Sequence, residues 1–312
     1  MWRSTPAHSS HRPFAMTETA AQRRTGIALV IAAAVAWSTA AFFTKLLPLD
    51  SWTILFWRGL FGGATITVIL VLTQGPAGLR DFTNMGRNGW LMASLSMLGM
   101  ITFIPALQLT SVSNVAIIIA TGPFVAAAIA FVWLRESLQV RTLLAMLVAF
   151  GGVIIIVGGA RGSSDMIGIA LACFMILVIS VMTVLVRRHK GTPMVAAAAL
   201  SNLLGSVVSL PFAHGITGIT ATELATLAMF GFCQVGLGLS LFVLGSRFLP
   251  SGQATLIGTL ETPLMPFWVW LAFQEVPSGR ALFGGALVMG AVVADIFGEI
   301  RAQKQLSAPP SS

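Results

Sequence analysis

The sequence predicts an all-α membrane protein in which ten transmembrane helices form two inverted halves of five. Apolar residues make up 56% of the 312 residues, charged residues only 9%, and the mean hydropathy is +0.89. A soluble domain carries about a quarter charged residues. The apolar residues also form ten stretches that are long enough to cross a membrane. An internal repeat divides these stretches into two sets of five.

The repeat is visible in residues 108–160, which are echoed without a gap 139 positions later. Glu136 and Arg141, for example, correspond to Glu275 and Arg280. Because each copy contains an odd number of spans, the second copy must cross the membrane in the opposite direction to the first. Inverted repeats of this kind are a common architecture of secondary transporters.

Each predicted span has about the 20 residues that are needed to cross about 30 Å of hydrocarbon. Most linkers are short, so successive helices are expected to be antiparallel neighbours. The predicted spans of the first half are 26–47, 52–73, 89–107, 112–134 and 140–160, and those of the second half are 166–186, 193–213, 222–245, 251–273 and 279–298.

The basic residues predict the direction of insertion. If the N-terminus is cytoplasmic, 14 of the 18 Lys and Arg residues lie on the cytoplasmic side, and Lys45, Arg161 and Arg280 on the other. This distribution follows the positive-inside rule. We therefore expect a multi-pass protein of the inner (plasma) membrane with both termini in the cytoplasm. The expected organisation is a disordered leader 1–25, a first half 26–160, a second half 166–300 and a disordered tail 301–312.

Composition and motifs disfavour several other classes of protein. The basic residues lie between apolar spans and form no stripe, so the net charge of +8 does not indicate a nucleic-acid partner. Cys173 and Cys233 both fall inside predicted spans, which disfavours a disulfide or a metal site. The sequence contains neither a phosphate-binding G-x-x-x-x-G-K-[ST] loop nor an H-E-x-x-H or G-x-S-x-G motif. We expect neither an enzyme nor a bound cofactor.

Two stretches of the sequence resemble the ends of EamA repeats. The first runs from Thr121-Gly-Pro123 through Leu134-Arg-Glu136 to Gly151-Gly152, and the second from Leu260-Glu-Thr-Pro263 through Glu275 to Gly290. Two such repeats resemble the ten-span members of the drug/metabolite transporter superfamily over roughly residues 25–300. The resemblance implies a central cavity between the two halves. It also implies movement of small metabolites, often amino acids, by alternating access, with export common among bacterial members.

One position departs from the family pattern. Many members carry Glu-Pro in the ninth span, whereas here Glu261 is followed by Thr262 and the proline is displaced to Pro263. The corresponding residues of the first half are Gly122-Pro123, so the first half has no acidic residue at this position. We therefore expect no symmetric role for the two positions.

Glu261 is the leading candidate for transport chemistry. It lies about ten residues, or about 15 Å, into its span and hence close to the midplane of the bilayer. A carboxylate in that position is costly unless it faces a wet cavity, finds a partner or is protonated. Glu261 is therefore a candidate for substrate binding and for proton coupling. The alternative interpretation is a hydrogen-bonded residue that ties its helix to neighbouring helices.

Other candidates for substrate binding are polar or aromatic residues within the predicted spans. Trp37 offers an aromatic face to an amphiphilic metabolite, with hydroxyl groups nearby. Asn114 and Gln253 occupy matching positions of the two repeats. Proline breaks can line a substrate site and act as hinges. Helix packing is the alternative role for every one of these residues. The remaining candidates are Ser38, Thr39, Pro123, Ser180, Asn202 and Gln234.

Three charged residues are predicted to have structural roles. Arg58 lies about six residues inside its span, from where its long side chain can snorkel to the interface; attraction of a substrate carboxylate is the less favoured alternative. Glu136 and Glu275 end their helices on opposite membrane faces. Their recurrence together with Arg141 and Arg280 predicts a structural clasp at each face.

These observations favour a secondary transporter that exports small metabolites, with amino acids as the favoured substrates. Its partners would be the small molecule and the lipid bilayer, without nucleic acid. A homodimer is a further candidate, because glycine clusters permit close helix approach. The alternatives are an exporter of amphiphilic drugs or other metabolites, an intramembrane enzyme and a non-transporting membrane scaffold. Sugar phosphates are disfavoured because deep clusters of Arg or Lys are missing.

Overall fold

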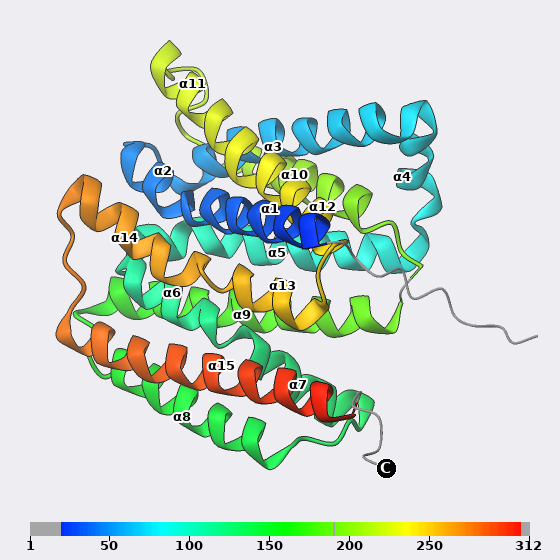
Figure 1. Cartoon of the computed structure of the whole chain (residues 1–312). Helices are drawn as coiled ribbons and strands as arrows, with labels where there is room; N and C mark the ends of the chain where they lie inside the picture. The colour runs from blue at the N-terminus through cyan, green and yellow to red at the C-terminus, as the bar shows by residue number, and fades with distance from the viewer. Residues whose placement is uncertain (1–19, 190, 307–312) are drawn as a thin grey trace, which may run out of the picture.

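The computed structural model describes residues 20–189 and 191–306, and these residues form ten helical spans (Figure 1). The predicted leader and tail lie mostly outside the described residues. Helix α1 nevertheless begins at Ala20 and helix α15 ends at Leu306, so the helices extend into both predicted segments. A helix pairs its backbone N–H and C=O groups internally, which is why apolar segments of this length are helical in a bilayer.

The first half contains the five spans that the sequence predicts. Some spans consist of more than one helix. Its elements are α1 (Ala20–Ser38) and α2 (Ala40–Leu46), α3 (Ser51–Gln74) with η1 (Gly75–Leu79) and α4 (Arg80–Asn84), α5 (Gly86–Leu109), α6 (Val112–Ala120) and α7 (Gly122–Leu134), and α8 (Val140–Val157).

The second half repeats this order. Its elements are α9 (Ser163–Arg188), α10 (Met194–Ser209) with η2 (Leu210–Phe212), α11 (Ala221–Phe230), η3 (Gly231–Leu237) and α12 (Gly238–Ser246) in one span, α13 (Ser251–Gly258) and α14 (Glu261–Phe273), and α15 (Gly279–Leu306). The element η3 is a π-helix.

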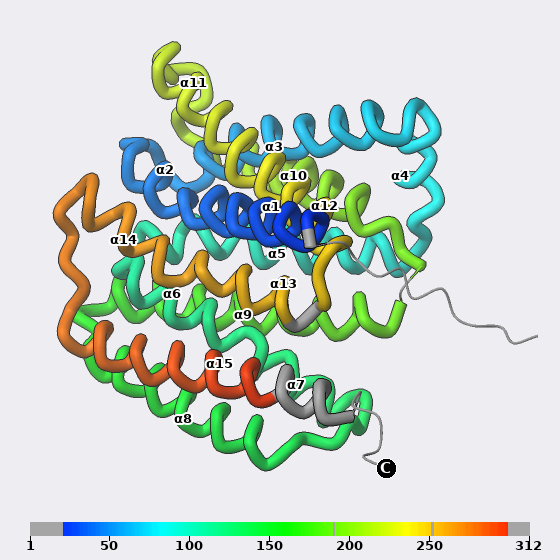
Figure 2. The backbone as a smooth tube through the Cα atoms, viewed as in Figure 1, coloured from blue at the N-terminus to red at the C-terminus, as the bar shows by residue number. Residues whose placement is uncertain are grey.

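The two halves interlock rather than stand side by side. Helix α3 packs along α10, α8 along α15, α5 along α9, and α1 along α12 (Figure 2). Each of these pairs joins one helix of the first half to one of the second. The contact between the third and sixth spans is the counterpart of the contact between the first and eighth, as an inverted repeat requires.

Glycines allow the fifth and tenth spans to approach each other closely. A Cβ atom added to Gly152 would lie 2.8 Å from the carbonyl oxygen of Gly284, and one added to Gly284 would lie 2.8 Å from the carbonyl oxygen of Gly152. This reciprocal backbone contact lies within one chain. The two glycines are therefore used for internal packing of α8 on α15.

Three spans are broken at a threonine. Thr39 separates α1 from α2, Thr121 separates α6 from α7, and Thr259 lies between α13 and α14. Each hydroxyl donates to the carbonyl oxygen three residues earlier, at 2.6, 2.7 and 2.6 Å respectively. Such back-bonding competes with the helical hydrogen bonds and bends the chain. The breaks at Thr121 and after Thr259 occupy matching regions of the two repeats, just ahead of Pro123 and Pro263.

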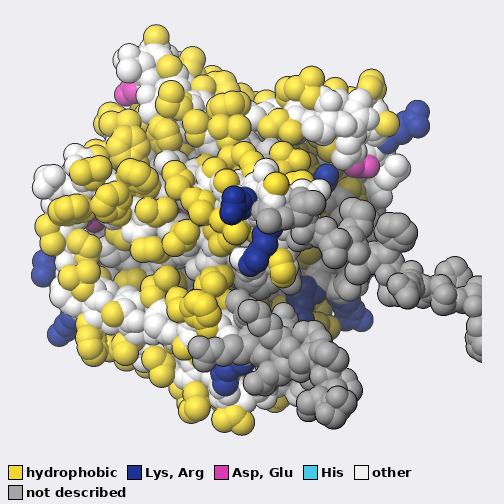
Figure 3. Space-filling view, viewed as in Figure 1, with side chains coloured by type: hydrophobic (Ala, Val, Ile, Leu, Met, Phe, Trp, Pro, Cys, Tyr) yellow, Lys and Arg dark blue, Asp and Glu magenta, His cyan; other side chains and the backbone are white. Residues whose placement is uncertain are grey.

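The outer surface is predominantly apolar. Hydrophobic side chains cover most of the face seen in Figure 3. Leu72 and Val132 are 79% and 78% exposed. Large apolar side chains with this exposure would be costly in water and are what a lipid-facing surface requires. The chain is a multi-pass membrane protein.

Candidate substrate-binding cavity

A cavity of about 450 Å³ lies between the two halves. The first four spans of each half contribute side chains to its wall, whereas α8 and α15 do not. Its volume falls within the range of about 300–1,000 Å³ that is usual for small-molecule sites. The polar and aromatic residues of the wall are Trp37, Arg58, Ser96, Phe103, Ser201, Asn202, Gln234 and Glu261.

Arg58 and Gln234 form the shortest hydrogen bond among the described residues of this wall. Nη2 and Nε of Arg58 donate to Oε1 of Gln234 at 2.6 and 3.2 Å. The guanidinium also lies 5.1 Å from the centre of the Phe230 ring, and the whole residue is only 2% exposed. The prediction that Arg58 snorkels to the interface is therefore wrong. Its side chain is held inward by a hydrogen-bond acceptor and an aromatic face from a distant span.

The π-helix η3 places Gln234 opposite Arg58. A π-helix adds one residue to the turn and displaces the following side chains, and it occurs most often at functional sites. Gly231, at its first position, lies so close to α3 that an added Cβ would be 2.7 Å from the backbone nitrogen of Gly62. Gly238, just after it, is similarly close to the Trp37 ring. The eighth span thus needs small residues to bring Gln234 into the cavity.

Asn202 presents a free acceptor in the same wall. Its Nδ2 donates to the carbonyl oxygen of Ala198 at 2.9 Å, which fixes the orientation of the amide because a carbonyl oxygen can only accept. The other end of the amide, Oδ1, is buried without a hydrogen-bond partner in the described residues. The donor Nη1 of Arg58 is likewise buried without a hydrogen-bond partner in the described residues. Among the described residues, the cavity wall therefore holds a buried donor, Arg58 Nη1, and a buried acceptor, Asn202 Oδ1, that have no partner.

Glu261 is the first residue of α14 and lines the cavity from the ninth span. The break after Thr259 places its side chain at the start of a new helix. Within the described part of the chain, no hydrogen bond or ion pair holds its carboxylate. The wall therefore carries one basic and one acidic side chain that are not paired with each other.

The structure brings four of the predicted candidates together around this cavity: Trp37, Asn202, Gln234 and Glu261. Trp37 is also held by the Phe242 ring, with 5.1 Å between the ring centres. Sequence reasoning missed Ser96 and Ser201, whose hydroxyls are 3.2 Å apart, and assigned Arg58 to the interface. The position of Arg58 about six residues inside its span was the one feature of the sequence that could have indicated its place in the cavity wall.

The other predicted candidates do not line the cavity, and their polar groups are used elsewhere. Ser38 accepts a hydrogen bond from Trp268 Nε1 at 2.8 Å, and Ser180 donates to the carbonyl oxygen of Gly122 at 3.2 Å. Asn114 donates to Thr110 at 3.0 Å. Three candidates remain. The Thr39 hydroxyl donates to the carbonyl oxygen of Ala36 at 2.6 Å, and Gln253 accepts a hydrogen bond from Arg23 at 3.4 Å. Pro123 lines a separate polar pocket beside Glu136.

The helix-end glutamates pair with other residues than the predicted ones. Glu136 forms an ion pair with Arg187 at 3.0 Å, and Glu275 forms one with Lys45 at 3.0 Å. Arg141 instead lies 3.3 Å from Asp295, and Arg280 donates to the carbonyl oxygen of Gly158. The predicted clasps of Glu136 with Arg141 and of Glu275 with Arg280 are therefore wrong. All four side chains reach the other half: the arginines join α8 to α15, and the glutamates join the fourth span to the sixth and the ninth span to the first.

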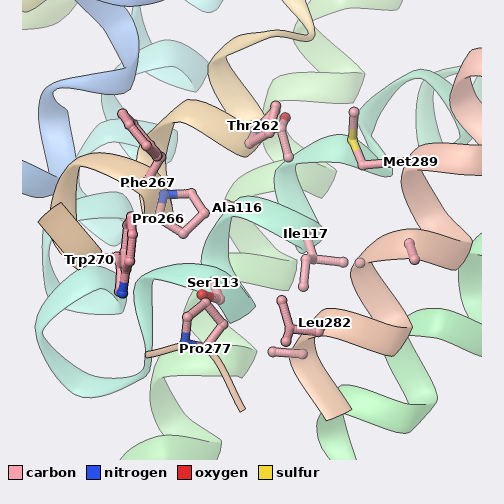
Figure 4. A pocket seen from close by; sticks show the side chains of 14 residues that line it. Ser113, Ala116, Ile117, Thr262, Pro266, Phe267, Trp270, Pro277, Leu282 and Met289 are labelled. Atoms are coloured by element: carbon pink, nitrogen blue, oxygen red, sulfur yellow. The ribbon is translucent and has the colours of Figure 1, made fainter. Parts of the chain in front are cut away.

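A second pocket of about 480 Å³ lies between α6, α14 and α15 (Figure 4). Pro266, Phe267, Trp270 and Leu282 line it, and it has no charged residue in its wall. Phe267, Trp270 and Leu282 are all exposed on the molecular surface. A groove of this composition suits a hydrocarbon chain of the bilayer. The cavity around Arg58 and Glu261 is therefore the better candidate for a polar substrate.

Known proteins share this sequence pattern and this fold. The sequence matches the EamA-like transporter family over residues 24–158 and again over residues 166–294. No curated protein matches the sequence. The fold matches 27 chains of solved structures. One of them, a crystal structure whose description says only that it is a protein, has a TM-score of 0.62 and a sequence identity of 18%. The match covers 87% of this chain and 97% of the chain in that structure. At this identity the likeness concerns the fold alone.

Proposed function

Because the chain belongs to the EamA-like transporter family and therefore moves small molecules across a membrane, we propose that its substrates are amino acids. In this proposal it is a secondary transporter of the inner membrane with both termini in the cytoplasm. It exports its substrates by alternating access between the two membrane faces.

The observation that carries the substrate proposal is the presence of one basic and one acidic side chain in the wall of the central cavity. Arg58 and Glu261 line the same space and are not paired with each other. A zwitterion supplies the opposite charge to both. A phosphate ester would need several basic groups, and Arg58 is the only Lys or Arg among the described residues that line the cavity.

The inverted halves supply the movement. The cavity lies between them, so a rocking motion of one half against the other exposes it to one face at a time. The broken spans near Thr121 and Thr259 provide bends at the cavity level. Protonation of Glu261 on one face and its release on the other would couple transport to the proton gradient.

Flux into proteoliposomes tests this function directly. The purified protein is reconstituted and assayed with a panel of radiolabelled amino acids, with and without an imposed pH gradient, against empty vesicles. We expect saturable uptake of at least one amino acid and faster uptake with the gradient. If amphiphilic drugs are moved and amino acids are not, the substrate proposal is wrong and the family assignment stands.

A further inference from the structure

Building on the proposed function, we propose that Arg58 is the anchor for the substrate's carboxylate and that the cavity selects amino acids with large apolar side chains. The substrate class is thus an α-amino acid with a free carboxylate, a free ammonium group and an uncharged side chain. Amides and esters of the same amino acids, which lack the carboxylate, bind less tightly.

The first step of the argument is the incomplete bonding of Arg58. Two of its nitrogen atoms share the single oxygen Oε1 of Gln234, and Nη1 is buried with no partner in the described residues. Gln234 is neutral, and none of the ion pairs within the described chain includes Arg58. A guanidinium buried to 2% exposure without a counter-ion is costly unless an anion is supplied. The cavity that it lines is where such an anion can arrive.

The second step concerns the geometry that Gln234 imposes. Gln234 accepts from the Nε and Nη2 atoms and leaves Nη1 without a partner in the described residues. A carboxylate suits this position because an oxygen accepts a charge-assisted hydrogen bond from Nη1. The Phe230 ring, whose centre lies 5.1 Å from the guanidinium carbon, stabilises the cation without satisfying any of its donors. Gln234 and Phe230 are therefore positioning residues for the anchor.

The third step places the ammonium group. Asn202 Oδ1 is buried and unpartnered, and Asn202 lies on α10 directly against α3: a Cβ added to Gly59 would be 2.6 Å from the Asn202 carbonyl oxygen. Gly59 is the neighbour of Arg58 in sequence. The unused donor and the unused acceptor thus lie on two helices in direct contact. Glu261 supplies the negative charge in the same cavity.

Apart from Ser96 and Ser201, the rest of the wall is apolar and adaptable. It includes three methionines, Met100, Met175 and Met182, together with Phe103 and Ile179. Methionine side chains adjust to different apolar shapes, which favours a class of substrates over a single one. A second charged group on the substrate's side chain would face this wall without a partner. The cavity therefore favours residues such as leucine, methionine and phenylalanine.

Paired ligands test the anchor on the wild-type protein. Binding to the purified protein is measured for L-phenylalanine and L-methionine and for the carboxamide of each, by calorimetry and by inhibition of flux. We expect each acid to bind about 10-fold more tightly than its carboxamide, or better, because a charge-assisted hydrogen bond is lost with the carboxylate. Equal binding of acid and carboxamide would overturn the inference while leaving amino-acid transport intact. If neither member of any pair binds or moves, both this inference and the proposed substrates fail.

Variants then assign the effect to one residue. Arg58→Gln is expected to bind acid and carboxamide equally, whereas Arg58→Lys retains part of the preference because the charge remains without the planar fork. Arg247→Gln, which removes an exposed arginine outside the cavity, is expected to leave the preference unchanged. If Arg58→Gln folds and keeps the wild-type preference, another residue holds the carboxylate. If it does not fold, the wild-type comparison alone decides whether the carboxylate is recognised.

Discussion

Lys45 at the end of the first span forms an ion pair of 3.0 Å with Glu275 at the end of the ninth, and so joins the two halves of the protein. Arg187 and Glu136 form the counterpart at the opposite face, also at 3.0 Å. Both acids and both bases occupy related positions of the two repeats. In the alternating-access cycle proposed above, one pair would break while the other holds. Each pair is thus placed to bias the equilibrium between the two open states.

The first prediction concerns the pair of Lys45 with Glu275. Both side chains are partly exposed, so we expect the pair to contribute about 0.2–1 kcal/mol. Glu275→Gln should therefore shift the conformational equilibrium toward opening of this face by about 1.5- to 5-fold. The measurement is the labelling rate of a cysteine introduced at Ser201 in the cavity wall, with Cys173 and Cys233 replaced. The reagent is membrane-impermeant and is added from this face.

Two further variants control this experiment. Exchange of the charges in Lys45→Glu with Glu275→Lys should restore the original labelling rate. Glu223→Gln should have no effect, because Glu223 belongs to the capping box of α11 and does not join the two halves. An unchanged rate in Glu275→Gln would show that the pair does not bias the opening.

The second prediction concerns Glu261. Glu261→Gln keeps the size and one oxygen of the side chain and removes its ability to release a proton. We expect loss of pH-gradient-driven accumulation, with exchange of labelled for unlabelled substrate retained. Both are measured in the same proteoliposomes, again with Glu223→Gln as the matched control. Undiminished gradient-driven accumulation in Glu261→Gln would show that Glu261 is not the proton carrier.

The third prediction compares two adjacent glycines in α8. An added Cβ at Gly152 meets the Gly284 backbone at 2.8 Å, whereas nothing lies within 4 Å of one at Gly151. We expect Gly152→Ala to destabilise the protein by about 1–3 kcal/mol through overpacking. Gly151→Ala should be neutral or slightly stabilising, because alanine is the better helix former. Thermal unfolding in detergent gives both values, and equal effects would mean that the contact between α8 and α15 is not tight.

The architecture was predictable from the sequence because it follows from local properties. Apolar length sets the spans, and an odd number of spans per copy sets the inversion. The sequence also indicated four residues of the cavity wall, because a polar or aromatic residue in the middle of an apolar span can be recognised from the sequence alone. These residues are Trp37, Asn202, Gln234 and Glu261.

The details of the site were not predictable because they depend on contacts between distant spans. Arg58 is held inward by Gln234, which lies 176 positions later and is brought into place by a π-helix. From the sequence alone, the hydroxyls of Ser38 and Ser180 cannot be distinguished from hydroxyls that bind a substrate. In the structure they form hydrogen bonds with Trp268 and with the Gly122 backbone. Only the three-dimensional structure shows which polar groups are left free.

The last prediction concerns Asp50, which lies outside the spans and caps α3. Its carboxylate accepts hydrogen bonds from the backbone nitrogens of Trp52 and Thr53, each at 3.0 Å, and from the Thr53 hydroxyl at 2.6 Å. Partial burial acts to raise the pKa of Asp50, but the hydrogen bonds from Thr53 and Trp52, with the nearby charge of His214, outweigh it and hold the pKa below its ordinary value of 3.8.

A lowered pKa in the folded state means that the ionised cap stabilises the protein fully above pH 3.8 and that this contribution is lost as the pH falls through the folded-state value. Asp50→Ala should therefore lower the free energy of unfolding by about 0.5–2 kcal/mol at neutral pH, with a smaller difference in acid. Asp50→Asn, which also caps helices well, should cost less at neutral pH, and the difference between Asp50→Asn and Asp50→Ala should not depend on pH because neither variant carries the ionisable group. Thermal unfolding in detergent at pH 7 and at acidic pH measures both variants. A difference between Asp50→Ala and wild type that stays constant across this range would show that the cap does not depend on the charge.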